Sequence, residues 1–179
     1  MFFRSVRNMI DFKQFREHVV VQTLKDLEEC IPYSESAVDL LMMTCAHESK
    51  GGTYLKQVQG PALGVYQMEP STHYDIWDNY LNYNRKLEVT VSCLIETSGL
   101  HDNMLITSLA YATAMARIHY YRVSEPLPVL PPLSTCIDKK HQEGLYLWQL
   151  AEYAKKHYNT VAGKATPEKY YNDYLEWRG

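Results

Sequence analysis

The sequence is poor in features that draw nucleic acid or anchor a protein in a membrane. Its 18 lysines and arginines are outnumbered by 21 aspartates and glutamates, the formal net charge is −3, and no run of basic residues stands out. Nucleic-acid binding generally relies on a positive field. No apolar stretch approaches the length of a membrane span. We therefore expect no nucleic acid among the partners and no membrane span.

Paired cysteines and metal-ligand spacings are also missing. The four cysteines, Cys30, Cys45, Cys93 and Cys136, are scattered without a CxxC pair, and the histidines show neither an HExxH motif nor paired-ligand spacing. Zinc sites and disulfide frameworks normally have such spacings. We expect no metal, and free thiols at Cys30 and Cys45, which have apolar neighbours on predicted helices. Free buried thiols favour a cytosolic origin.

Phenylalanine is scarce, with 4 residues against 15 tyrosines. Tyrosine pairs an apolar ring with a hydrogen-bonding tip, which suits a sugar-binding cleft and a protein interface equally well. Hydrophobic residues make up 46% and charged residues 22% of the chain, as in an ordinary soluble protein. We expect one domain, residues 1–179, with a sizeable core.

The first residues lack the apolar core of a secretion signal. Arg4 and Arg7 interrupt the stretch 1–10, whereas a signal peptide carries about 7–15 consecutive apolar residues. We expect the protein to be made in the cytoplasm without a signal peptide. An enzyme that attacks the cell wall would then need another route to its substrate.

Apolar periodicity and helix-ending residues predict an all-α fold, or helices with a minor hairpin. Asp11 and Pro32 mark the ends of a first helix, and Thr166-Pro167 has the N-cap and N1 residues of a last one. Ser34 or Ser36 opens the second helix. The predicted helices cover residues 11–29, 34–50, 70–81, 86–97, 103–123, 139–158 and 166–177, with at most a short hairpin within 53–69.

Two further features predict how these helices are arranged. The helix 103–123 is the longest apolar one and is rich in alanine, which lets neighbours approach closely and predicts a central position. Four prolines then predict an extended segment over the surface: Pro126, Pro128, Pro131 and Pro132. We divide the chain into a catalytic core, 1–123, and a C-terminal part, 124–179, packed on it.

The second helix carries the candidate catalytic acid, Glu48. Its apolar stripe follows the i, i+3, i+4, i+7 rule, and Glu48 is the next position of that stripe. Gly51-Gly52 is a strong signal for the helix end. An acid among apolar side chains tends to keep its proton, as a general acid requires. The alternatives are a helix that ends earlier and a buried ion pair. The stripe consists of Val38, Leu41, Met42 and Cys45.

Two motifs in this region resemble the signature of the soluble lytic transglycosylases. In that family a Glu-Ser pair at a helix end precedes a Gly-Leu-Met-Gln-like loop and a Pro-x-Thr helix start. Here Glu48-Ser49 is followed by the loop Ala62–Met68 and by Glu69-Pro70-Ser71-Thr72, and Gln67 follows Glu48 by 19 residues. The resemblance implies a lysozyme-like α fold with extra C-terminal helices, in which the glutamate lies at the bottom of a glycan cleft.

The resemblance also implies roles for individual residues. Glu48 would be the acid and base, while Ser49 and Gln67 would orient the substrate or the acid. Tyr66 stands where the family usually has methionine, and would form a sugar-contacting wall. The plainer alternatives are that Gln67 bonds backbone groups and that Tyr66 packs in the core.

A later Tyr-Asn-Ala-Gly element of the family has a rough counterpart at 109–114, where Tyr111 is kept and the Asn and Gly are lost. Tyr120 or Tyr121 could take that place instead, because both lie nearer the family's usual distance from the acid. Tyr111 and Tyr120 are therefore our candidate substrate-binding tyrosines. The alternative for each is a core tyrosine on a long helix.

The number of carboxylates bears on the type of reaction. Hydrolytic glycosidases generally pair two, and the candidates for a second one are in no recognisable motif: Glu69, Asp75, Asp78 and Glu96. Lytic transglycosylases need only one. The resemblance thus implies cleavage between N-acetylmuramic acid and N-acetylglucosamine with a 1,6-anhydro product, and no cofactor.

The segments 112–123 and 158–166 resemble phage-encoded members of this group, which ride in the virion or tail and open the wall. The partners implied are peptidoglycan strands and other virion or tail proteins, and carriage by the particle would replace a signal peptide. Two alternatives stay open: a lysozyme-type hydrolase of the same fold, and a structural virion or tail protein without activity.

Overall fold

The computed structural model describes residues 10–95, 102–132, 138–159 and 164–178. Most of these residues are helical, and none of them belongs to a β-strand. Two isolated β-bridges join Lys56 to Leu63 and Leu63 to Met68. The prediction of an all-α fold is confirmed. The expected hairpin is reduced to those two bridges.

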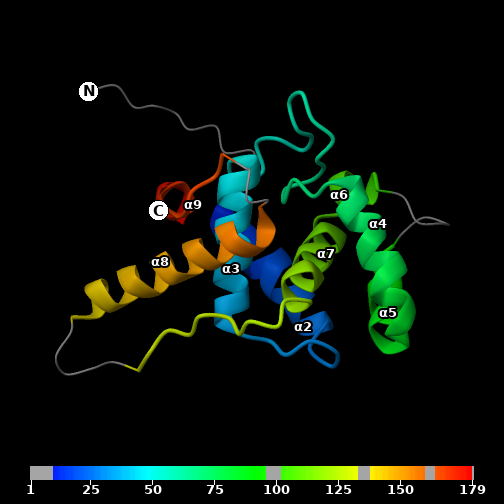
Figure 1. Cartoon of the computed structure of the whole chain (residues 1–179), viewed down its shortest axis with the longest axis horizontal. Coiled ribbons are helices and arrows are strands. Elements are labelled where there is room, and N and C mark those ends of the chain that lie inside the picture. Colours follow the sequence, from blue (N-terminus) through cyan, green and yellow to red (C-terminus); the bar gives the residue numbers. More distant parts are fainter. Residues whose placement is uncertain (1–9, 96–101, 133–137, 160–163, 179) are drawn as a thin grey trace.

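Most helices begin and end close to the positions that capping residues and prolines predicted for them (Figure 1). Asp11 accepts a hydrogen bond from the Gln14 backbone N–H, and Ser34, not Ser36, caps the second helix. The first helix has a π-helical middle. The elements are α1 (Phe12–Gln14), η1 (Phe15–Val20), α2 (Val21–Asp26), α3 (Glu35–Ser49), α4 (Pro70–Asn79), η2 (Leu81–Tyr83), α5 (Arg85–Ser92), α6 (Met104–Thr107), α7 (Leu109–Tyr121), α8 (Lys139–Tyr158) and α9 (Pro167–Arg178).

Helix α3 stands in the middle of the molecule and is crossed by α8 (Figure 1). Its residues 36–46 are buried, with Asp39 as the exception. It ends at Lys50, which adopts the left-handed conformation with φ 50°, and Gly51 follows with φ 59°. The helix therefore ends next to the predicted Gly51-Gly52 signal, with Lys50 and not a glycine in the first left-handed position.

The expected continuous helix over 103–123 is wrong. Ser108 has an extended backbone (φ −124°, ψ 110°) and its Oγ accepts from the Tyr111 N–H, so it ends α6 and caps α7. A serine cap competes with helix continuation because it satisfies a free backbone donor. The longest helix is instead α8, with 20 residues.

Helix α7 is nevertheless central, as its alanines predicted. Ala112 and Ala116 belong to one hydrophobic cluster with α3, α8 and α9, whereas Ala114 and Met115 belong to a second cluster with α4 and α5. Small side chains allow this close approach on both sides. Helices α8 and α9 complete the larger cluster, so the C-terminal part shares its core with α3.

No helix within the described ranges is both long and apolar enough to cross a membrane. Cys30, Cys45 and Cys93 are free, and Cys45 is buried. Cys136 lies outside the described residues.

Candidate active site

Glu48 lies in the last turn of α3 and is half-buried. Its Oε1 accepts hydrogen bonds from the Tyr170 hydroxyl at 2.6 Å and from the Asn159 Nδ2 at 2.8 Å. Asn159 also donates to the Tyr170 oxygen at 2.5 Å, which links the two donors. No described residue bonds to Oε2. One carboxylate oxygen is therefore held, and the other is available to a ligand.

Glu48 opens into a pocket of about 200 Å³, which we call the Glu48 pocket. Most of its lining side chains carry a polar group, and the walls come from the 53–69 loop, α4, α7 and the end of α8. A cavity lined by amides, hydroxyls and acids suits a polar, uncharged ligand such as a sugar. The lining residues are Glu48, Gln57, Ala62, Gln67, Met68, Glu69, Thr72, His119, Tyr158 and Asn159.

Gln67 lines the pocket, and its side chain bonds backbone groups, as the plainer alternative predicted. Its Nε2 donates to the Gly64 carbonyl at 2.7 Å and to the Tyr54 carbonyl at 3.2 Å. The loop needs glycine at 64, because φ is +74° and a Cβ would lie 2.0 Å from the Leu105 carbonyl oxygen. The side-chain oxygen of Gln67 receives no hydrogen bond from a described residue.

Tyr66 and Ser49 are buried next to the site and do not line the Glu48 pocket. Tyr66 is 1% exposed and its hydroxyl bonds the Thr113 Oγ1, as the core-packing alternative predicted. Ser49 is fully buried, donates to the Cys45 carbonyl and accepts from the Gly52 N–H. Ser49 therefore fixes the turn after Glu48, because its hydroxyl is occupied by backbone groups.

The two tyrosines expected on the 103–123 helix lie in the core, away from the pocket. The Tyr111 hydroxyl bonds His73 Nε2 at 2.7 Å and accepts from the Trp77 Nε1 at 2.8 Å. The Tyr120 hydroxyl bonds the Thr44 Oγ1 at 2.8 Å. Neither lines the Glu48 pocket, so the assignment of Tyr111 and Tyr120 as substrate contacts is corrected. Helix α7 is packed from both sides, which leaves these side chains no route to solvent.

Tyr158 and Asn159, at the end of α8, line the Glu48 pocket in place of the tyrosines expected there. The Tyr158 hydroxyl donates to the Tyr66 carbonyl at 2.8 Å. Asn159 is 111 residues from Glu48 in the sequence, so no local pattern around the acid points to it.

Burial keeps the tyrosine donors protonated. Burial, and then the charge of Glu48, raise the pKa of Tyr158 and the pKa of Tyr170 well above the usual value. Tyr170 comes from α9, and its ring also stacks on His47 at 3.9 Å between centroids. Sequence reasoning missed Tyr170, since nothing in a helix of tyrosines and charged residues marks one tyrosine as a partner of a distant acid.

His119 lines the pocket as a neutral ring. Its Nε2 lies 3.0 Å from the His157 carbonyl oxygen, which assigns the proton to Nε2. Burial lowers the pKa of His119. Its Nδ1 is then an acceptor for a ligand hydroxyl.

Glu69 supplies a second carboxylate to the pocket. It is exposed, and its Oε2 accepts from the Ser71 hydroxyl at 3.3 Å. Asp75 is instead paired with Arg122 at 2.7 Å, Asp78 does not line the pocket, and Glu96 lies outside the described residues. The number of carboxylates therefore does not by itself decide between a one-acid and a two-acid reaction.

No group of three or more His, Cys, Asp and Glu within the described part of the chain is placed to hold a metal ion. Comparisons with protein-family models, with curated proteins and with solved structures returned no match. The support for a function therefore comes from the residues and geometry of this chain.

Proposed function

We propose that this protein is a peptidoglycan lytic transglycosylase of lysozyme-like fold, with Glu48 as its acid and base. The observation that carries the proposal is the environment of Glu48. Its Oε1 accepts hydrogen bonds from Tyr170 and Asn159, and no described residue bonds to its Oε2. The pocket beside it is small and polar. These features support a general acid that acts on a glycosidic oxygen.

The held oxygen decides how the proton moves. In the neutral acid, Oε1 is the carbonyl oxygen that accepts from Tyr170 and Asn159, and Oε2–H points to the substrate. Oε2 protonates the oxygen between N-acetylmuramic acid and N-acetylglucosamine, and the C1–O bond breaks. The muramic C6 hydroxyl attacks C1, closes a 1,6-anhydro ring and returns its proton to Glu48.

The other polar groups of the pocket bind and orient the sugar in this proposal. The Gln67 side-chain oxygen and His119 Nδ1 accept from sugar hydroxyls. Tyr158 forms a wall whose ring meets the His119 ring at 5.1 Å between centroids. No metal or cofactor takes part, because the substrate supplies its own nucleophile.

Glu69 favours a second candidate, a lysozyme-type hydrolase. Two carboxylates in one pocket are what hydrolysis requires, with Glu69 activating water or attacking C1. The test is the Glu69→Gln variant: a transglycosylase keeps its anhydro products, whereas a two-carboxylate hydrolase loses its activity.

The protein acts on the wall as part of a phage particle in this proposal, and the support is the resemblance of 112–123 and 158–166 to phage-encoded members. Mass spectrometry of purified particles would find the chain among virion or tail proteins. Absence of the chain from intact particles would remove this part of the proposal and leave the chemistry untouched.

The deciding experiment is digestion of purified peptidoglycan and mass spectrometry of the products. Wild type releases 1,6-anhydro-muropeptides, Glu48→Gln releases none, and Glu176→Gln, an exposed glutamate on α9, matches wild type. Ordinary reducing muramic ends would favour the hydrolase. If wild type and Glu48→Gln are equally active, the assignment of Glu48 as the acid fails. If neither shows activity, the enzyme proposal fails and the structural virion protein stands.

A further inference from the structure

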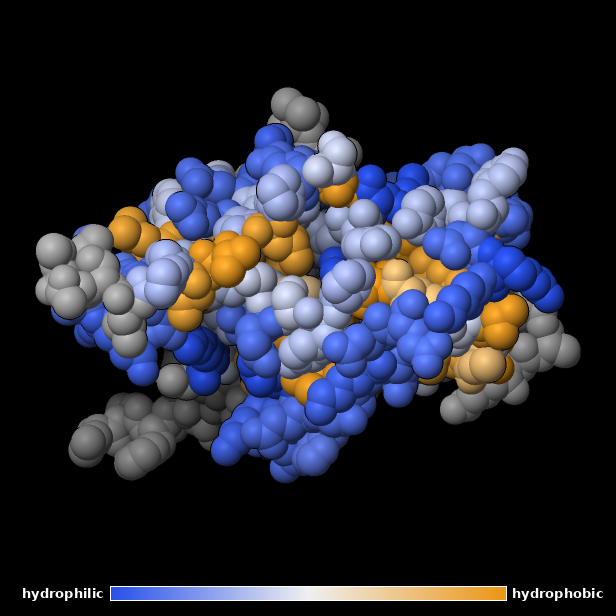
Figure 2. Space-filling view, turned by 90° about the horizontal axis from the view of Figure 1, so that it is seen from below, coloured by the Kyte–Doolittle hydropathy of each residue, from blue (hydrophilic) through white to orange (hydrophobic). Residues whose placement is uncertain are grey.

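A second cavity, of about 440 Å³, lies between the N-terminal helix, α3, α8 and α9, and we call it the Asp39 pocket. Its walls are mainly apolar, with charged groups at the rim. The extended segment 123–132 borders it, and Figure 2 shows apolar residues gathered over that segment on the lower face. The apolar walls are Phe12, Met42, Leu130, Tyr146 and Leu147.

Asp39 is the carboxylate of this pocket that forms no ion pair with a described residue. Its two carboxylate oxygens each accept one tyrosine hydroxyl, from Tyr146 at 3.1 Å and from Tyr174 at 3.2 Å. A carboxylate offers about four acceptor positions, so both oxygens retain capacity for a further donor. Burial raises the pKa of Asp39, although the tyrosine hydroxyls and the charges of Arg16 and Arg178 act in the opposite direction.

The nearby cations are already paired with other acids. Arg16 bonds Glu35 at 2.6 Å and Arg178 bonds Glu143 at 2.5 Å, while neither forms an ion pair with Asp39. Lys13, also at the rim, is exposed and pairs with no described residue. Asp39 is therefore a carboxylate that forms no ion pair with a described residue, beside apolar walls.

We propose that the Asp39 pocket binds a small molecule or side chain with an apolar body and one protonated amine, the amine on Asp39 and the body against Met42 and Leu147. The apolar walls take the methylene groups, and the free acceptor positions of the carboxylate take the ammonium hydrogens. This site is separate from the proposed glycan chemistry. Asp39 and Glu48 are nine residues apart on α3, which corresponds to about 13 Å along the helix.

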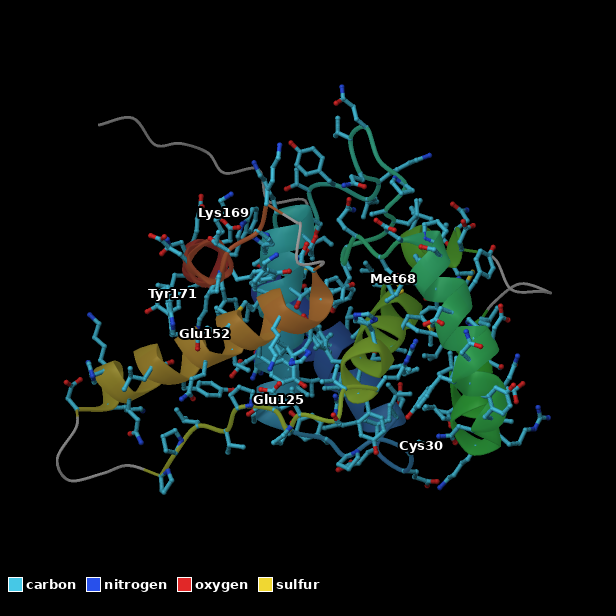
Figure 3. The ribbon with its side chains drawn as sticks, in the orientation of Figure 1. Cys30, Met68, Glu125, Glu152, Lys169 and Tyr171 are labelled. Carbon is cyan, nitrogen blue, oxygen red and sulfur yellow. The ribbon has the colours of Figure 1, made fainter. Side chains whose placement is uncertain are left out.

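Methyl NMR of the full chain tests this, because two methionines report on the two pockets separately. Met42 lines the Asp39 pocket and Met68 lines the Glu48 pocket. In Figure 3, Met68 lies on the opposite side of α3 from the N-terminal end of α8. With ¹³C-methyl methionine, hexylammonium shifts the Met42 signal saturably and leaves Met68 in place. An unmoved Met42 signal overturns the proposal.

The next test compares hexylammonium with ligands that lack the ammonium group. Hexan-1-ol and hexanoate have the same body without the ammonium, and we expect each to bind at least about tenfold more weakly than hexylammonium. Equal binding of hexanol overturns the proposal. This comparison uses wild-type protein, so it holds even if an Asp39 variant fails to fold.

We expect Asp39→Asn to lower the affinity for hexylammonium by about tenfold. Asp78→Asn, a matched change on the exposed side of α4, leaves the affinity unchanged. Unchanged affinity in Asp39→Asn contradicts the proposal. A capped lysine (Nα-acetyl-lysine methylamide) identifies the source of the amine. If it binds like hexylammonium, the ligand is a lysine side chain of a peptide; if it does not, the ligand is a free amine.

Discussion

Glu48 and Asp39 lie on the same helix, and each accepts a hydrogen bond from a tyrosine of α9, Glu48 from Tyr170 and Asp39 from Tyr174. These tyrosines are four residues apart and so share one face of α9. The surroundings differ. Glu48 faces a small pocket of polar side chains, whereas Asp39 faces a larger one with mostly apolar walls.

The difference shows how the same donor type can leave different acceptor positions open. Both donors of Glu48 converge on one oxygen, and no described residue bonds to the other. The two donors of Asp39 are divided between its oxygens. Under our two proposals, the first arrangement serves proton exchange with a substrate and the second serves recognition of a cation.

The largest effect is expected from Glu48→Gln. It removes the exchangeable proton while preserving the two hydrogen bonds to position 48, and we expect wall-lytic activity to fall by about 10²–10⁴-fold. Turbidity of a peptidoglycan suspension measures the rate. A thermal melt equal to that of wild type would show that the loss is chemical. Retention of more than about a tenth of the rate would contradict the assignment.

Two glycines, one in the loop of the Glu48 pocket and one within α8, give a matched pair of substitutions. Gly64→Ala, in the loop of the Glu48 pocket, introduces a Cβ about 2 Å from a backbone oxygen at positive φ, and we expect it to lower the free energy of unfolding by about 2–4 kcal/mol. Urea denaturation measures the change.

Gly144→Ala, within α8, is the matched control. A Cβ there meets only the Tyr171 hydroxyl, at 3.6 Å, and a helical alanine should stabilise by about 0.5–1 kcal/mol. If both variants change stability by the same amount and sign, the loop around Gly64 is not constrained as described.

Tyr170→Phe removes the shorter of the two hydrogen bonds to Glu48. We expect kcat to fall by about tenfold, because Asn159 alone then holds Oε1 and a hydrogen bond to a charged group is lost. Tyr171→Phe is the neighbouring control, since Tyr171 packs on Trp148 and lies on the other side of α3 from Met68 (Figure 3). Equal rates for the two variants would exclude a positioning role for Tyr170.

The smallest effect is a pH dependence from Asp39. Burial raises its pKa above the usual value, so the folded protein binds this proton more tightly than the unfolded chain does. The contribution of Asp39 to the free energy of unfolding therefore becomes more favourable as the pH falls through the folded pKa towards the unfolded one. Comparing wild type with Asp39→Asn by urea denaturation, from about pH 7 to about pH 4, isolates it. A difference that is constant with pH would contradict the raised pKa.

Local signals in the sequence determined where most helices begin and end, and where the acid stands. Asp11, Ser34 and the Gly51-Gly52 pair act through backbone groups within a few residues, so their effect does not depend on the rest of the fold. These helix boundaries were predicted correctly from residue type and spacing. The roles of Glu48 and Gln67 stay predictions, although both residues line one pocket.

The tertiary structure alone decided which side chains meet Glu48. Tyr170 is 122 residues away and Asn159 is 111 residues away, on two helices whose packing no local pattern specifies. The packing of α7 also places the side chains of Tyr111 and Tyr120 in the core. A tyrosine bears the same signal in sequence whether it holds a catalytic acid, fills a core or lines a pocket, because its partner is chosen by how the helices pack.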